Sequence, residues 1–302
     1  MAHDHQHHHH APALRSVNRA FVIGIVLNLG FVLVEAGFGL FYNSLALLSD
    51  AGHNLSDVAS LVLSLLAFRL AKVRPTARYT YGYKKSTILV SLLNAIILLV
   101  AVGVILAESI EKLARPQPVD GDAIAWVAGI GVAVNAVTAW LFFRHQAHDL
   151  NIKGAFLHLA ADALVSVGVL VSGIVIHFTD WYVIDPVIGL VVAAVILIST
   201  WSLLRDSLRL SLDGVPAGLD VTAVAGQLRR IPGVRDIHHI HIWAISTTQN
   251  ALTAHVVVDT LDRMEPVKEA IRRQLEHEGI SHATLEFEQP GVNCGPRCES
   301  RD

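Results

Sequence analysis

The chain divides into two parts that differ in how apolar and polar residues follow one another. Up to about residue 207, apolar runs of roughly twenty residues are separated by short polar segments. A helix of about twenty residues is long enough to cross the ~30 Å hydrocarbon core of a bilayer. The pattern therefore predicts six membrane-spanning helices, at about residues 20–41, 44–70, 86–107, 123–143, 154–178 and 184–204.

From about Asp213 the pattern becomes that of a soluble domain. Val221, Val224 and Leu228 recur at helical spacing before the Pro232-Gly233 turn, and residues 234–245 then alternate as in a strand. A second strand at 252–258, a helix at 266–277 and a strand at 282–288 complete the order helix, strand, strand, helix, strand. This order predicts a small α+β domain. Strict alternation puts His239, His241 and Trp243 on one face of the first strand, opposite His238, Ile240 and Ile242.

The composition agrees with a membrane protein. Of the 302 residues, 53% are hydrophobic and 16% charged, and the mean hydropathy is +0.49. We expect four parts: a His-rich tail (1–19), a six-helix transmembrane domain (20–207), a cytoplasmic domain (208–290) and a Cys-containing tail (291–302). The partners expected are a lipid bilayer and small ions, with no nucleic acid.

The basic residues predict which ends of the helices face the cytoplasm. The loop between the second and third helices carries six of them: Arg69, Lys72, Arg74, Arg78, Lys84 and Lys85. Loops rich in Lys and Arg stay on the cytoplasmic side. Six spans then place both termini in the cytoplasm.

Ionisable residues inside the second span are the main candidates for function. In the stretch 48–57, LSDAGHNLSD, the residues Asp50, His53, Asn54 and Asp57 recur at i, i+3, i+4 and i+7 and share one helix face. His158 and Asp162 repeat the spacing in the fifth span.

The two pairs together predict a metal site. A His and an Asp from each of two facing helices supply four ligands, a set that suits tetrahedral Zn²⁺. The alternative is that these residues only hydrogen-bond helices together, but each charged group costs at least ~2.5 kcal/mol near a bilayer centre. Four protein ligands leave no open position for a reactive water, which favours carriage of the ion over catalysis.

Further metal-binding side chains lie outside the spans. The N-terminus, MAHDHQHHHH, is interpreted as a native metal-attracting tail, with an expression tag as the alternative. Histidines are frequent in the α+β domain, so a second metal site there is a hypothesis, with ordinary surface histidines as the alternative. Cys294 and Cys298 form a weak metal-binding signal in a terminus that is otherwise expected to be a disordered tail.

Several stretches resemble the cation diffusion facilitator family, in particular its zinc, cobalt and cadmium efflux members. They are SDAGHNLSD, GAFLHLAADALVSVGV, RYTYGYKK, HIHIW and TAHVVV, and the resemblance covers nearly the whole chain. It implies a homodimer with a cytoplasmic ferredoxin-like domain in each subunit. The resemblance further implies that the dimer lies in a bacterial inner membrane and exports Zn²⁺ from the cytoplasm in exchange for protons.

The resemblance also assigns residues to the two sites. The transport site falls on His53, Asp57, His158 and Asp162, with Asp50 and Asn54 assisting. In the cytoplasmic domain, family patterns point to His238 and His255, completed by His282 or Glu288, with His241 as a further candidate. Which of the neighbouring histidines faces the metal is left open by the strand alternation. Two alternative functions remain: a zinc-sensing receptor and an intramembrane metal-dependent hydrolase. The sequence lacks the HExxH and Gly-x-Ser-x-Gly motifs expected of such a hydrolase.

Overall fold

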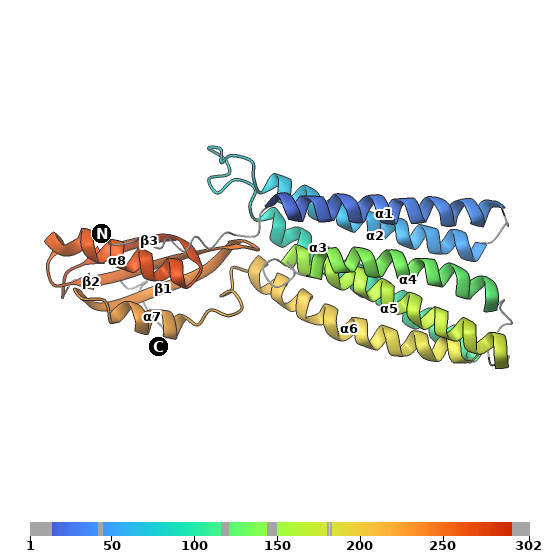
Figure 1. The fold of residues 1–302 in the computed structure, drawn as a ribbon. Helices are drawn as coiled ribbons and strands as arrows, with labels where there is room; N and C mark the ends of the chain where they lie inside the picture. The colour runs from blue at the N-terminus through green and yellow to red at the C-terminus, as the bar shows by residue number, and fades with distance from the viewer. Residues whose placement is uncertain are drawn as a thin grey trace, which may run out of the picture. The chain divides into compact units, whose positions relative to one another are not determined.

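The computed structural model describes residues 14–41, 45–115, 121–143, 150–179, 181 and 183–291. Its elements are the helices α1 (Leu14–Phe41), α2 (Leu45–Leu70), α3 (Ser86–Ala114), α4 (Gly121–Phe143), α5 (Leu150–Thr179), α6 (Ile184–Ser211) and α7 (Val221–Arg229), the strands β1 (Val234–Ser246) and β2 (Gln249–Val258), the short 3₁₀ helix η1 (Leu261–Arg263), helix α8 (Met264–His277) and strand β3 (Ile280–Glu288) (Figure 1). The predicted helices and strands are all present. Among the six apolar helices, the largest boundary difference is seven residues, at the ends of α3 and α6.

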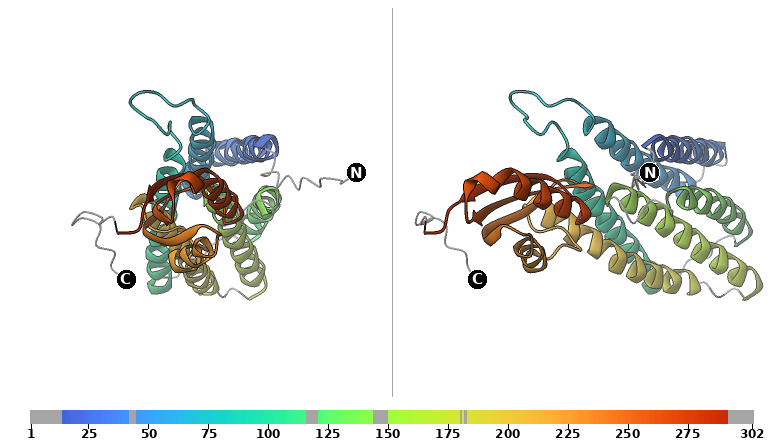
Figure 2. Two further views of the ribbon diagram at one scale, coloured as in Figure 1. Left: turned by 90° about the vertical axis from the view of Figure 1, so that its left-hand side faces the viewer. Right: turned by 60° about the vertical axis from the view of Figure 1, so that its left-hand side comes forward.

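The chain forms two compact units. The first consists of Met1–Arg69 and Leu93–Leu204, and the second of Leu70–Leu92 and Arg205–Asp302. In the first unit, α5 packs against helices on both of its sides (Figures 1 and 2). Ile152, Ala155 and Leu159 of α5 join a buried cluster with residues of α1, α2 and α4. Ala161 packs with residues of α3 and α6. Helix α5 is therefore the centre of this unit.

The described residues contain three segments that are long and apolar enough to cross a membrane. They are Ser86–Ala114, Ala125–Phe143 and Leu150–Gly168. Two shorter apolar segments, Arg19–Val34 and Val58–Leu70, lie in α1 and α2. Large apolar side chains of these helices and of α6 point away from the protein, for example Trp126 of α4 and Ile198 of α6, which are 78% and 75% exposed. Such an apolar outer surface suits contact with lipid.

The second unit contains a three-stranded sheet in the order β1-β2-β3. Strands β1 and β2 are antiparallel, and β2 and β3 are parallel because α8 connects them. Helix α8 buries Val267, Ile271 and Leu275, which recur every four residues, in one core with residues of α7 and the sheet. On β2 the core takes Leu252, Ala254, Val256 and Val258. The intervening residues, among them His255, thus point to the other face of the sheet.

Residues 70–92 belong to the same unit and contact the α+β fold at three points. Lys85 Nζ lies 2.5 Å from Asp213 Oδ1, just after α6. The backbone N–H of Thr247, in the turn between β1 and β2, donates to Thr87 Oγ1 at 3.1 Å. The ring of Tyr81 meets His282 edge to face, with centroids 5.5 Å apart. The start of α3 is therefore tied directly to the sheet.

Candidate functional site

His158 and Asp162 form an ion pair in the middle of α5, which we call the α5 pair. The pair joins His158 Nε2 to Asp162 Oδ2 over 3.7 Å, and the two side chains are 5% and 13% exposed. The i, i+4 spacing places both on one face of the helix. Burial of a carboxylate and an imidazole in such an apolar helix is costly without a function.

A small cavity lies next to His158, between α2, α3 and α5. Its lining includes Ser60 and Leu61 from α2, Asn94 from α3 and Gly154 from α5. The Asn94 amide donates to Ser64 Oγ at 2.8 Å. Among the described residues, neither Asn94 Oδ1 nor Ser60 Oγ has a hydrogen-bond partner, although both are buried. Such atoms call for a water molecule or another polar ligand.

The α2 half of the predicted transport site is described only in part. Asp50, His53 and Asp57 lie within the backbone of α2, but their side chains are outside the described residues. Asn54, on the same predicted face, is buried, with 8% of its surface exposed.

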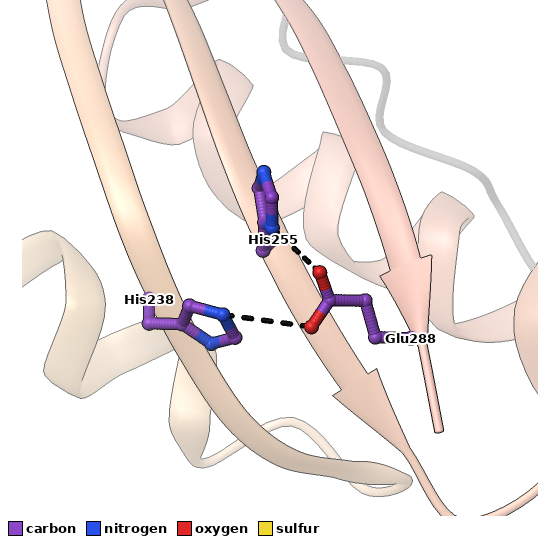
Figure 3. Close-up of side chains that lie close together, drawn as sticks. All are labelled: His238, His255 and Glu288. Carbon is purple, nitrogen blue, oxygen red and sulfur yellow. Dashed lines mark hydrogen bonds and ion pairs between the residues drawn. The ribbon is translucent and has the colours of Figure 1, made fainter. Parts of the chain in front are cut away.

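His238, His255 and Glu288 come together on the open face of the sheet, and we call them the sheet cluster. They come from three different strands, and one ligand atom from each lies within 4.8 Å of the others. Figure 3 shows the Glu288 carboxylate between the two rings, with Oε1 2.6 Å from His255 Nδ1 and Oε2 3.5 Å from His238 Nε2. Glu288 is 9% exposed. Two imidazoles and a carboxylate are three of the four ligands of a tetrahedral zinc site.

The strict alternation predicted for the first strand is wrong for His238, which lies on the same side as His239 and His241 and not opposite them. His238 pairs with His255 and His241 with Thr253, so two residues of β1 oppose only Ala254, and this is a β-bulge. The bulge turns His239 to the same side as its neighbours. Its ring centroid is 5.0 Å from that of His255 and 4.6 Å from that of His241.

The other predicted ligands of the cytoplasmic domain are placed as follows. His241 lies beside His239, with their Nε2 atoms 3.3 Å apart. His282 lies at the far end of β3 from Glu288, opposite Ala251, and contacts Tyr81. It is not brought into the sheet cluster. Cys294 and Cys298, like the histidines of the N-terminal tail, lie outside the described residues.

His239 lies next to this cluster but is not among the ligands predicted from the sequence. Partial burial, together with the nearby rings of His241, His255 and His238, lowers its pKa, while Glu286 acts in the opposite direction. A signal for the bulge exists in the sequence. The apolar residues Ile237, Ile240 and Ile242 all contribute to the core, and the step of three between the first two breaks the alternation.

Two family models match the chain. The model of the cation efflux transmembrane domain matches residues 21–210, and that of the cation efflux protein cytoplasmic domain matches residues 216–289. The second of these is a dimerisation domain, which agrees with the expected homodimer.

Similar proteins match almost end to end. The cadmium, cobalt and zinc/H⁺-K⁺ antiporter of Bacillus subtilis is 35% identical over 98% of this chain and 97% of its own. The zinc transporter ZitB of Escherichia coli is 36% identical over 99% of this chain and 96% of its own. The metal-bound C-terminal domain of the CzcD transporter from Cupriavidus metallidurans is a solved structure with 35% identity and a TM-score of 0.22, covering 23% of this chain and 99% of its own.

Proposed function

The chain belongs to the cation efflux family, the cation diffusion facilitators, and we propose that it exports Zn²⁺ from the cytoplasm in exchange for protons. Membership of this family makes it an integral membrane transporter of metal cations and not an enzyme, so the hydrolase hypothesis is wrong. We include Cd²⁺ and Co²⁺ as substrates, because imidazole nitrogen suits all three ions. We place the transporter in a bacterial inner membrane as a homodimer, with both termini in the cytoplasm.

The α5 pair is the observation that supports this proposal most strongly. His158 is buried and Asp162 largely buried, in a helix that is apolar enough to span the membrane. Ionisable side chains in such helices usually belong to a pathway for ions or protons. We assign the two side chains as half of the transport site.

The other half is assigned to His53 and Asp57 of α2. Helix periodicity supports this assignment, since Ser60 and Leu61 follow Asp57 by three and four residues and line the cavity beside His158. The face of α2 that carries Asp57 therefore continues into the face that meets α5. Four ligands, two imidazoles and two carboxylates, then hold Zn²⁺ tetrahedrally, with Asp50 and Asn54 assisting from the same face.

Proton exchange follows from the chemistry of these ligands. A histidine or carboxylate must lose its proton before it binds a metal ion, so loading with Zn²⁺ releases protons and protonation releases Zn²⁺. When the helices expose the site alternately to the two sides of the membrane, each ion carried outward is replaced by protons carried inward. The oxygens of Ser60 and Asn94, which have no hydrogen-bond partner among the described residues, offer polar contacts to an ion or water in the cavity.

The sheet cluster is assigned as a regulatory zinc site. We propose that Zn²⁺ bound to His238, His255 and Glu288 tightens the dimer and favours transport. The contact between Thr247 and Thr87 supports a connection from the sheet to α3, because it joins the β1–β2 turn to the first turn of that helix. Loss of His238 and His255 should then change how transport depends on zinc concentration, and unchanged transport at every concentration would exclude this role.

Zinc flux is the test of the proposed function. The full chain in proteoliposomes, with an imposed proton gradient, should take up zinc, whereas Asp57→Ala and Asp162→Ala should each abolish uptake. Asp262→Ala is the matched control, because Asp262 is an exposed carboxylate outside the membrane-spanning helices. Equal uptake without either aspartate would refute the transport site. Zinc binding with no flux in the unsubstituted protein would instead favour a zinc-sensing receptor.

A further inference from the structure

Residues 71–85 form the loop that joins α2 to α3, and we call them the α2–α3 loop (Figures 1 and 2). Together with Arg69 at the end of α2, this loop carries six basic residues and no acidic one. The preference of basic loops for the cytoplasm accounts for such a charge, but it requires no particular structure of the loop. The charge alone therefore does not identify a ligand.

The backbone of the α2–α3 loop is folded by its own hydrogen bonds. The N–H of Thr76 donates to the carbonyl oxygen of Tyr79 at 3.0 Å, and the N–H of Tyr79 donates to the hydroxyl of Thr76 at 3.2 Å. The N–H of Gly82 donates to the same carbonyl of Tyr79 at 2.8 Å. Gly82 has a φ of +70°, and a Cβ there would lie 3.0 Å from the carbonyl oxygen of Val73. The loop thus turns back on itself and holds its side chains at defined positions.

Most cations of the α2–α3 loop are left for a ligand outside the chain. Lys85 pairs with Asp213. Within the described part of the chain, no side-chain ion pair or hydrogen bond is formed by the other four cations of the loop, Lys72, Arg74, Arg78 and Lys84. The first three of them are exposed. Such a concentration of positive charge without acidic neighbours attracts an anionic ligand.

Tyrosine rings accompany these cations. Tyr79, Tyr81 and Tyr83 are 52%, 43% and 36% exposed. The rings of Tyr79 and Tyr83 pack together with their centroids 4.8 Å apart, while Tyr81 contacts His282 of the sheet. Exposed tyrosine is typical of the membrane–water interface, where the ring meets apolar lipid and the hydroxyl meets the headgroups. A free anion needs no such rings, so they favour a lipid as the ligand.

We propose that the α2–α3 loop binds the headgroup of an anionic phospholipid. Lys72, Arg74 and Arg78 supply the positive charge, and the paired rings of Tyr79 and Tyr83 lie against the glycerol end of the acyl chains. The loop begins where α2 ends, so the headgroups of the adjoining leaflet lie within its reach. Clusters of four to eight basic residues next to a membrane-spanning helix attract anionic lipid, and each residue near the surface strengthens the attraction by about fivefold. This binding does not depend on the transport site.

Native mass spectrometry of the full chain in detergent measures the binding. Phosphatidylglycerol and phosphatidylcholine with the same acyl chains are titrated separately, and the dissociation constant of the first bound lipid is determined. The double variant Arg74→Gln/Arg78→Gln should bind phosphatidylglycerol roughly 25-fold more weakly and phosphatidylcholine as before. Arg272→Gln/Arg273→Gln is the matched control, because it removes the same charge from exposed positions on α8 and should bind both lipids like the unsubstituted protein.

Two further measurements separate lipid binding from misfolding and from binding of a free anion. Arg74→Lys/Arg78→Lys keeps both charges and should retain most of the affinity for phosphatidylglycerol, and that affinity should fall as salt is added. Soluble glycerol 3-phosphate should bind far more weakly than the lipid, because it lacks the acyl chains. Equal affinity for phosphatidylglycerol in the glutamine variant of the loop and in the α8 control would refute the proposal. Equal affinity for glycerol 3-phosphate and phosphatidylglycerol would overturn the assignment to a lipid. Zinc flux can fail or succeed independently of these results.

Discussion

Glu288 holds the three strands of the sheet together at their open face, and its replacement allows a quantitative prediction. In the zinc-free protein, Glu288→Gln removes a carboxylate that accepts a hydrogen bond from His255 at 2.6 Å and faces His238 at 3.5 Å. The side chain is only 9% exposed, so solvent replaces these contacts poorly. A hydrogen bond to a charged group contributes about 1.5–3 kcal/mol. We expect a local loss of stability of this size.

Hydrogen exchange of β2 and β3 in the full chain measures that loss. Amides in these strands exchange through local opening, so 1.5–3 kcal/mol corresponds to exchange about 10 to 150 times faster. Glu286→Gln is the control, because Glu286 is 70% exposed and its contact with His255 is worth about 1 kcal/mol or less. Added zinc should slow exchange in the control and much less in Glu288→Gln. Equal exchange rates in the two zinc-free variants would refute the assignment of Glu288 as the residue that holds the cluster.

Two further predictions concern the cavity and the histidines of the sheet. Asn94→Leu should leave the protein folded but slow zinc transport about tenfold, equivalent to ~1.4 kcal/mol in the barrier. Asn135 is a buried asparagine of α4 that does not line the cavity, so Asn135→Leu should leave transport unchanged. Equal slowing in both variants would show that the cavity is not part of the transport pathway. The zinc-free α+β domain should lose stability as the pH falls below about 6.5, because the pKa of His239 is lowered in the folded state and the unfolded chain therefore binds more protons. Thermal unfolding at several pH values should show this slope, and His239→Asn should reduce it; an unchanged slope would contradict the prediction.

The helices and the order of the strands could be predicted because each depends on local patterns. Apolar runs of about twenty residues predict spans, and the i, i+4 spacing of His158 and Asp162 already places them on one face. The bulge at His239 could not be located by strict alternation, since it has no glycine to mark it. Only the spacing of the isoleucines around it carries the signal.

The choice between His282 and Glu288 could not be made from sequence. Both lie on the last strand, and their distance from His255 depends on the register between β2 and β3, which tertiary packing sets. The contacts of Lys85 with Asp213 and of Thr87 with Thr247 join residues more than 120 positions apart. No local pattern predicts such pairs.

Proton movement driven by zinc tests the central claim most directly. Proteoliposomes that contain the full chain and a trapped pH indicator, with no pH gradient imposed at the start, receive a zinc gradient across the membrane. We predict that zinc entering the vesicles drives protons out, so that the interior becomes alkaline, and that Asp162→Asn shows neither zinc entry nor a pH change. Zinc entry with a constant interior pH in the unsubstituted protein would contradict exchange of metal for protons at the His-Asp site.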